Sequence, residues 1–179
     1  MDDNLAIAYL GALVGLLAIL AGLVLRQILK SRQYESVIGK LQPKLQTAKG
    51  TPQEYYELGS IYLRKKIYAR AIIEFQKALK AEGDVFPELY NALGYTYFSQ
   101  EQYDLAIKHY RTALELQPTY GIAMNNLAHA YEKKKLIPQA IAQYEQVLQL
   151  EPANKTAQQR LSSLRKRIPS TAPTPTDKI

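Results

Sequence analysis

The first twenty-five positions of the chain contrast with everything that follows them. An uncharged and almost wholly apolar run extends from Leu5 to Leu25. As an α-helix this run of 21 residues would rise about 31 Å, which matches the hydrocarbon core of a bilayer. A cleaved signal peptide, the main alternative, would carry a basic start, a shorter apolar core and a small-residue cleavage site. Because the run is long and follows the acidic Asp2 and Asp3, we predict a retained transmembrane anchor over residues 1–25.

Beyond the anchor, hydrophobic and polar positions follow a helical period, and the pattern repeats. A leucine, a small residue and, three positions later, a tyrosine recur as Leu58-Gly59-x-x-Tyr62, Leu93-Gly94-x-x-Tyr97 and Leu127-Ala128-x-x-Tyr131. Nine positions after each tyrosine stands an alanine, and four positions further an aromatic ring: Ala71 and Phe75, Ala106 and Tyr110, Ala140 and Tyr144. Periods of 35 and 34 residues are typical of stacked helical hairpins. Each unit therefore reads as two amphipathic helices, at 52–65 and 68–81, 87–99 and 103–116, and 121–133 and 137–150.

This spacing resembles the tetratricopeptide repeat over residues 52–153. The sequence departs from the usual motif at a few positions: Tyr55, Tyr90 and Met124 replace tryptophan, Val147 replaces alanine, and Lys66, Glu101 and Lys135 occupy turns that often hold glycine. The small residues are expected where the backbones of paired helices cross, and the rings are expected to fill the space between helices. We therefore predict an all-α fold, with one transmembrane helix followed by a three-repeat tetratricopeptide α-solenoid and a capping helix.

The predicted organisation has five parts. They are the anchor at 1–25, a basic juxtamembrane linker or helix at 26–51, repeats at 52–86, 87–120 and 121–153, a capping helix at 154–168 and a disordered tail at 169–179. The anchor helix should continue to about Ile38, after which Gly39, Pro43 and Gly50 are expected to break it. The capping helix is needed because the last repeat of a solenoid must cover its apolar face.

The formal net charge of +7 is unevenly spread along the chain. Residues 26–50 and 155–168 each carry a net +5, whereas residues 51–154 carry −1. The folded unit thus lacks the basic excess that a nucleic-acid partner would require, and we expect none. Arg26, Lys30 and Arg32 follow the anchor directly, so the positive-inside rule leaves the remainder of the chain on the cytoplasmic or stromal side. These three cations are also candidates for contact with anionic lipid headgroups.

The sequence carries few groups suited to catalysis or cofactor binding. It has no cysteine, which excludes disulfides, thiolate metal sites and a cysteine nucleophile. Its two histidines, His109 and His129, lie far apart and lack acidic neighbours at ligand spacing. A glycine-rich phosphate loop and a Ser/His/Asp set are also missing. We therefore predict a protein that is not an enzyme and that binds no metal or cofactor.

The expected binding surface is the concave face of the solenoid, formed by the first helix of each repeat. Its candidate residues are Tyr56, Ser60, Leu63 and Arg64, then Asn91, Tyr95, Phe98 and Ser99, then Asn125, His129, Glu132 and Lys133. This mixture of rings, amides and a few charges suits an extended peptide or protein surface. The carboxylate clamp of chaperone receptors is missing, because Tyr56, Ser60, Ile122 and Asn126 stand at its positions.

Three further features remain, a stripe of small residues and two basic runs. Gly11, Gly15, Ala18 and Gly22 form a stripe of small residues, which suits packing against a second transmembrane helix, from a homodimer or a client, but is also common in single spans. Lys133 to Lys135 end a predicted helix and complement its dipole as a solvated turn. The cations of the capping helix serve either solubility or contact with lipid.

The anchor, the basic segment, the three tyrosine-rich repeats and a length of 179 residues together resemble the membrane-anchored photosystem I assembly proteins of cyanobacteria and algal plastids. The resemblance implies a single-pass thylakoid protein with stromal or cytoplasmic repeats that hold photosystem I subunits or assembly intermediates as protein clients. A bacterial inner-membrane receptor for secretion or pilus assembly is the alternative, and a regulatory subunit of a membrane enzyme is a third.

Overall fold

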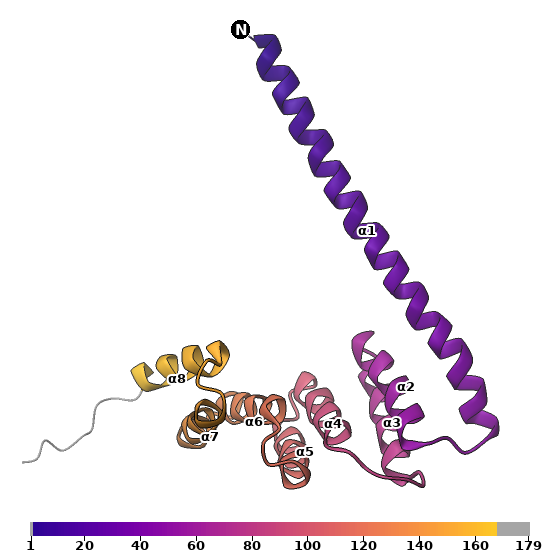
Figure 1. Cartoon of the computed structure of the whole chain (residues 1–179), viewed down its shortest axis with the longest axis vertical. Coiled ribbons are helices and arrows are strands. Elements are labelled where there is room, and N and C mark those ends of the chain that lie inside the picture. The colour runs from indigo at the N-terminus through magenta and orange to yellow at the C-terminus, as the bar shows by residue number, and fades with distance from the viewer. Residues whose placement is uncertain (1, 168–179) are drawn as a thin grey trace, which may run out of the picture. The chain divides into compact units, whose positions relative to one another are not determined.

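A computed structural model describes the backbone of residues 2–167 and the side chains from Ile7 onward. The described residues form eight helices and contain no strand, as predicted. The chain divides after Gly50 into two compact units, which Figure 1 shows as one long helix and a stack of shorter ones. The helices are α1 (Asp2–Thr47), α2 (Pro52–Arg64), α3 (Tyr68–Lys80), α4 (Pro87–Ser99), α5 (Tyr103–Leu116), α6 (Gly121–Lys133), α7 (Ile137–Leu150) and α8 (Lys155–Arg167).

The first unit consists of α1, which runs without interruption for 46 residues. The prediction that this helix ends near Ile38 is wrong, because it continues through Gly39 and Pro43 to Thr47. Proline lacks an N–H, so Pro43 removes only the one hydrogen bond that would reach the carbonyl of Gly39. The last turn forms all the same, and the Thr47 hydroxyl donates to the Pro43 carbonyl oxygen at 3.2 Å.

The apolar half of α1 has nothing packed against it. Its large side chains are exposed from Ile7 to Leu25. By length and composition α1 is the one helix among the described residues that could cross a membrane. Each exposed leucine forfeits roughly 1.5–3 kcal/mol of burial energy in water, so this surface favours an apolar surrounding.

The second unit contains the six repeat helices, whose bounds agree with the predicted ranges to within one residue. Local signals fix where they begin. Thr51 and Glu54 form a reciprocal capping box at the start of α2: the Glu54 N–H donates to Thr51 Oγ1 at 3.3 Å, and the Thr51 N–H donates to Glu54 Oε2 at 3.1 Å. Pro52 and Pro87 open α2 and α4, where a missing N–H costs nothing.

The repeat signature forms the core of each hairpin. A Cβ added to Gly59 would lie 2.7 Å from the ring of Phe75, and one added to Gly94 would lie 2.6 Å from the ring of Tyr110. Both rings are almost completely buried. These close approaches explain why a glycine and an aromatic ring recur together, and the buried Tyr62, Tyr110 and Tyr144 show that rings at the repeat positions serve packing.

The turns within the three hairpins share one backbone conformation. Lys66, Glu101 and Lys135 have φ values of 59°, 61° and 63°, in the left-handed region that favours glycine. After α2, for example, the Ile67 N–H donates to the Tyr62 carbonyl at 2.8 Å and the Lys66 N–H to the Leu63 carbonyl at 2.9 Å. This is the Schellman arrangement, and the equivalent bonds follow α4 and α6.

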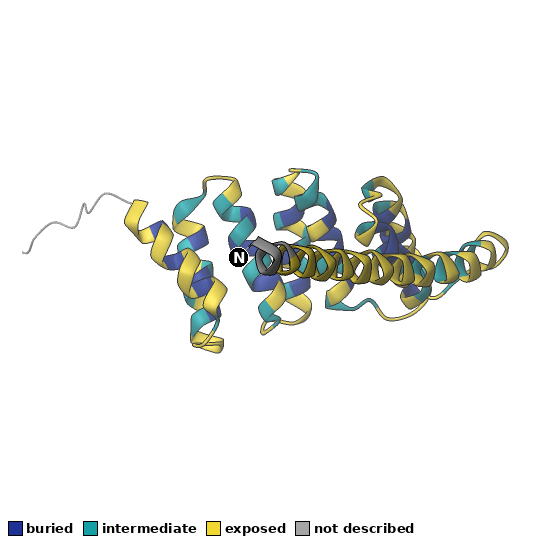
Figure 2. Cartoon of the chain, turned by 90° about the horizontal axis from the view of Figure 1, so that it is seen from above, coloured by how far each residue is buried: buried dark blue, intermediate teal, exposed yellow. Residues whose placement is uncertain are grey.

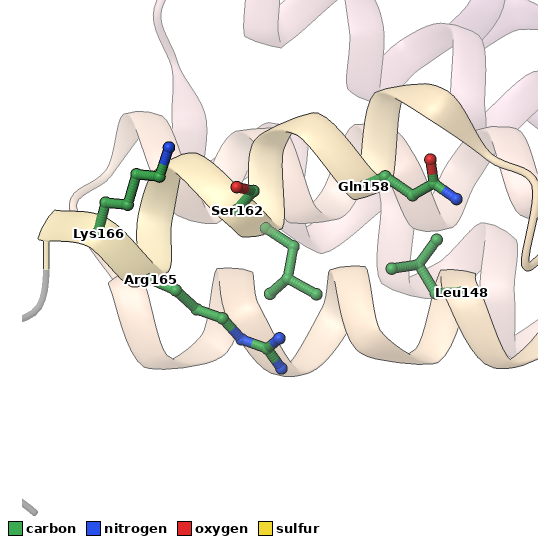
Figure 3. A pocket seen from close by; sticks show the side chains of 6 residues that line it. Leu148, Gln158, Ser162, Arg165 and Lys166 are labelled. Atoms are coloured by element: carbon green, nitrogen blue, oxygen red, sulfur yellow. The ribbon is translucent and has the colours of Figure 1, made fainter.

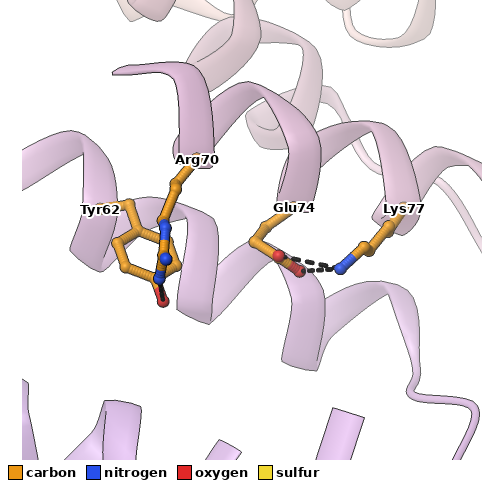
Figure 4. Close-up of polar contacts among 4 residues, drawn as sticks. All are labelled: Tyr62, Arg70, Glu74 and Lys77. Atoms are coloured by element: carbon orange, nitrogen blue, oxygen red, sulfur yellow. Dashed lines mark hydrogen bonds and ion pairs between the residues drawn. The ribbon is translucent and has the colours of Figure 1, made fainter. Parts of the chain in front are cut away.

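Polar contacts brace the first hairpin along α3 (Figure 4). The Arg70 guanidinium lies 5.6 Å from the centroid of the Tyr62 ring and donates to its hydroxyl at 3.3 Å. One turn further along α3, Lys77 pairs with the mostly buried Glu74 at 3.0 Å. Because Glu74 is largely withdrawn from water, its charge requires this partner.

The stack ends with α8, which packs against α7 as the predicted cap. Ala157, Leu161 and Leu164 are buried at this contact, and Asn154 caps the helix by accepting from the Ala157 N–H at 3.0 Å. Figure 2 shows buried residues where the helices face one another and exposed residues at the turns. Ile168, the expected last residue of the cap, and the predicted disordered tail lie outside the described residues.

Candidate protein-binding face

The contacts among helices identify the inner side of the stack. The first helices of successive repeats touch one another, α2 with α4 and α4 with α6, in addition to their hairpin partners. Within the described residues the second helices α3, α5 and α7 make no comparable contact among themselves. Because the helices that lie closer together occupy the inside of a curve, α2, α4 and α6 line the concave face.

The twelve candidate residues all lie on these three helices, and each is exposed or half-buried. Tyr95 is the most open of the rings, with 48% of its surface exposed. Arg64 and Lys133 are exposed at the C-terminal ends of α2 and α6. Half-buried groups supply the rest of the lining: Tyr56, Ser60, Leu63, Asn91, Phe98, Ser99, Asn125, His129 and Glu132. Side chains at these positions are accessible and are also held by neighbours.

Aromatic contacts fix several of these side chains and join adjacent repeats. The Tyr56 ring meets the Phe86 ring edge-on, with centroids 5.1 Å apart. Phe98 lies 4.8 Å from the His129 ring in the next repeat and 5.4 Å from Tyr103. Because these rings are already held in place, binding a ligand costs little further side-chain entropy. This property is typical of binding hot spots.

An amide network spans the second and third repeats. Asn126 Nδ2 donates to Asn91 Oδ1 at 2.9 Å, and the Asn91 side chain also hydrogen-bonds Tyr120. Burial, together with the Glu88 carboxylate and Tyr56, raises the pKa of Tyr120 against the opposing effect of the Asn91 hydrogen bond. Asn91 therefore sets the register between repeats as well as lining the face.

The capping helix reaches the far end of the concave face. Arg160 of α8 pairs with Glu132 at 3.3 Å, and the Tyr144 hydroxyl donates to the same carboxylate at 3.5 Å. Only 14% of the Glu132 side chain is exposed. Burial, followed by the positive charge of Arg160, lowers the pKa of His129. Glu132 is thus tied to α8 and His129 is held by the Phe98 ring, so this end of the face is pre-ordered.

Sequence reasoning missed four lining residues. Phe86 and Tyr120 stand just before α4 and α6 and are 34 residues apart, so an aromatic ring recurs at this position with the repeat period. That recurrence is the signal that could have identified them. Asn126 and Ile122 stand at clamp positions, and Ile122 is 60% exposed and adds apolar surface.

A separate open pocket of about 520 Å³ lies between α7 and α8 (Figure 3). Leu148 of α7 and five side chains of α8 line it: Gln158, Leu161, Ser162, Arg165 and Lys166. It is a shallow groove beside the cap and lies away from the concave lining. From Ile7 to Arg167 no group of three or more acidic or histidine side chains is arranged to hold a metal ion.

Comparison with known proteins places this architecture in a family. Tetratricopeptide-repeat family models match residues 55–84, 87–120 and 122–154. Solved tetratricopeptide domains share the fold. The first such domain of Spaghetti (RPAP3), bound to an HSP90 peptide, has a TM-score of 0.62 and 24% identity and covers 66% of this chain and 94% of its own. MamA has a TM-score of 0.71 and 20% identity, and covers 76% of this chain and 80% of its own.

Full-length relatives are more informative than these domains. The protein described as uncharacterized protein ycf37 of Cyanophora paradoxa is 36% identical over 94% of this chain and 99% of its own length. The ycf37 protein of Guillardia theta is 33% identical, with coverages of 94% and 97%. The chloroplastic tetratricopeptide-repeat protein PYG7 of Arabidopsis thaliana is 37% identical over 92% of this chain, which spans only 56% of that protein. The chain therefore belongs to the tetratricopeptide-repeat proteins and, among them, to the ycf37 family.

Proposed function

We propose that this protein is a membrane-tethered scaffold that assists the assembly or stabilisation of photosystem I by holding subunits or assembly intermediates on its concave face. The single observation that carries the proposal is the lining of α2, α4 and α6, where accessible rings occur in all three repeats and side-chain amides accompany them in the second and third. Its plastid and chloroplast relatives support a photosynthetic setting. The photosystem I role follows from the family resemblance.

The chemistry of the lining favours a polypeptide over a small molecule. Rings such as Tyr95 and Phe98 provide broad apolar contact, and side-chain amides can both donate and accept hydrogen bonds, as a peptide backbone requires. The surface is open along three repeats instead of closing into a pocket. An extended segment can lie along such a surface and contact each repeat in turn.

The α1 helix supplies the tether in this proposal. Its apolar half matches a bilayer, and Arg26, Lys30 and Arg32 follow at the end where anionic headgroups would lie. The repeats would then face the stroma or the cyanobacterial cytoplasm at the thylakoid membrane. Anchoring confines the scaffold to the same surface as membrane-embedded clients, so that moderate affinity is sufficient.

Site-specific photocrosslinking in native membranes tests the binding face. A photoreactive residue replaces Tyr95 on α4 or, as a matched control, Ile73 on α3, because the two are 48% and 49% exposed but lie on opposite layers. We expect adducts with a photosystem I subunit from position 95 and not from position 73. Equal adducts from both positions, or adducts only with unrelated proteins, would refute the proposed site.

Extraction tests the tether independently. Alkaline carbonate should leave the full chain in the membrane pellet, whereas a variant lacking residues 1–25 should be released by the same treatment. Release of the intact chain would show that α1 does not span the bilayer. The crosslinking result would still report on the concave face in that case.

A further inference from the structure

Charged residues of the repeat unit are sorted between its two edges. The first helices all run in one direction, and α8 continues the series, so their C-terminal ends and the turns after them share one edge (Figures 1 and 2). We define this basic edge as residues 64–66, 99–101, 133–135 and 165–167. It holds nine cations and one acid: Arg64, Lys65, Lys66, Lys133, Lys134, Lys135, Arg165, Lys166, Arg167 and Glu101.

The opposite edge has the reverse composition. Residues 51–54, 80–88, 115–121 and 151–155 hold six acids and two cations: Glu54, Glu82, Asp84, Glu88, Glu115, Glu151, Lys80 and Lys155. The net charge of −1 over residues 51–154 conceals this separation, because summing along the chain mixes the two ends of every helix. In the folded unit the charges lie apart.

Helix dipoles explain part of this arrangement but not all of it. A cation in the last turn of a helix is favourable, and one per helix end captures most of that benefit. Three consecutive cations repel one another. Moreover, Lys66 and Lys135 occupy left-handed positions, with φ values of 59° and 63°, where glycine would be unstrained. The additional cations are therefore present although they repel one another and although glycine would suit the backbone better at Lys66 and Lys135.

Only part of the basic edge is neutralised within the unit. Lys134 pairs with Asp104, and Arg165 pairs with Glu145 at 2.6 Å. Three segments of the basic edge each keep two further exposed cations: Arg64 and Lys66, Lys133 and Lys135, Lys166 and Arg167. Among the described residues no acid forms an ion pair with these six cations. Pairs of cations thus lie at or just after the end of the first helix of repeat one, at or just after the end of the first helix of repeat three and at the end of α8, whereas residues 99–101 of the second repeat hold none.

The basic edge is continuous with the proposed binding face, because Arg64 and Lys133 belong to both. We propose that it holds an acidic stretch of the same polypeptide that lies on the concave face. The proposal rests on the proposed function and specifies the partner further: the client carries carboxylates beside the segment that the rings and amides hold. Alternating apolar and acidic side chains would satisfy both surfaces at once.

The test uses the full chain in nanodiscs of neutral phosphatidylcholine. Two fluorescein-labelled peptides serve as probes: one alternates leucine with glutamate, and its partner carries glutamine in place of every glutamate. Fluorescence anisotropy gives their affinities at low and high ionic strength. The edge variant K66Q/K135Q/K166Q/R167Q leaves the concave residues intact. The control variant K80Q/K108Q/R111Q/K155Q removes the same number of exposed cations elsewhere.

At low ionic strength we expect the edge variant to bind the glutamate peptide about tenfold more weakly than the unmodified chain, since each exposed ion pair contributes up to about fivefold. The control variant should stay within about twofold, and high salt should remove the difference. Equal losses in both variants, or no loss in either, would overturn the proposal. So would anionic nanodiscs that abolish peptide binding, because the edge would then be occupied by lipid.

A third variant separates this inference from the proposed function. Y95A/F98A removes two concave rings, of which Phe98 also packs against the core, and should weaken both peptides alike. If neither peptide responds to Y95A/F98A while the glutamate peptide still depends on the edge, the concave face is wrong and the basic edge stands. If both peptides need the rings and ignore the edge, the concave face stands and this inference fails. Thermal unfolding of each variant checks that the repeats remain folded.

Discussion

The three left-handed turns allow a sharp test of how the hairpins are built. Lys66, Glu101 and Lys135 carry a Cβ at φ values near +60°, and replacing each with glycine removes the clash between that Cβ and the backbone. The hydrogen bonds of the turns involve only backbone atoms, so glycine keeps them. We expect each substitution to stabilise the repeat unit.

The magnitude follows from two opposing effects. An L-residue in the left-handed region costs about 1–2 kcal/mol, whereas glycine costs about 0.5–1 kcal/mol through the larger entropy of the unfolded chain. The midpoints of these two ranges differ by about 0.75 kcal/mol, which is the expected net gain per turn. Because the turns lie in different repeats and share no side-chain partner, the triple variant K66G/E101G/K135G should gain about 1.5–3 kcal/mol.

Tyrosine signals provide the assay. Twelve of the fourteen tyrosines lie between residues 51 and 167, so near-ultraviolet circular dichroism follows the repeats while α1 stays in a detergent micelle. The triple variant should raise the melting temperature by several degrees, at about 3–5 °C per kcal/mol for a unit of this size. Urea unfolding gives the same free energy by an independent route.

Two substitutions serve as controls for the first turn. Lys65 has an ordinary φ of −78°, so Lys65→Gly should destabilise the unit by about 0.5–1 kcal/mol. Lys66→Ala removes the charge but keeps the Cβ, and it should give no gain. If Lys66→Gly destabilises as much as Lys65→Gly, the strain argument is refuted. If Lys66→Ala stabilises as much as Lys66→Gly, relief of charge repulsion is the cause instead.

Three further predictions concern packing, capping and pH. Gly94→Ala should destabilise the unit by about 1–3 kcal/mol in urea unfolding, because the new Cβ would lie 2.6 Å from the Tyr110 ring. Thr51→Ala should cost about 0.5–2 kcal/mol by the same measurement, since the capping box at α2 is lost. Burial and Lys108 lower the pKa of His109, and burial with Arg160 lowers that of His129. The unfolded chain therefore binds these protons more readily, so the urea midpoint should be level above about pH 7 and fall as the pH drops below 6.5. The double variant H109Q/H129Q should flatten that fall, and an unchanged slope would show that other groups cause it.

The repeat helices could be predicted because the small and aromatic residues of one helix–helix contact recur three times in the sequence. Gly59 with Phe75 and Gly94 with Tyr110 are pairs that only a close crossing of two helices requires. In the third hairpin Ala128 and Tyr144 occupy these positions and are buried as well. This pattern remains recognisable when individual residues differ, because it depends more on the spacing of the small and aromatic residues than on their identity.

The end of α1 could not be predicted from residue types alone. Gly39 and Pro43 are both unfavourable inside a helix, and together they indicated a break that does not occur. Pro43 stands near the end of α1, and the hydrogen bond that it removes is a single one. Helical neighbours on both sides, from Ile38 to Thr47, outweigh that local cost.

The candidate face could be placed only in part for a related reason. Positions within one repeat follow from its period, whereas Asn91 with Asn126, or Phe98 with His129, pair across repeats. The sorting of charge between edges also depends on which helix ends come together. These contacts between repeats and this separation of charge exist only in the folded stack. Adding up the charges along the sequence hides the separation, because it mixes the two edges.

A continuous α1 gives the tether a function that a flexible linker would lack. A flexible chain of the same 22 residues would have a root-mean-square span of about 25 Å, and its end would sweep a broad range of heights above the bilayer. A helix fixes the end of α1 about 33 Å along one axis, and only residues 48–51 remain non-helical before α2. As the proposed tether, this helix would hold its own end within a narrower range of distances from Leu25 than a flexible chain could.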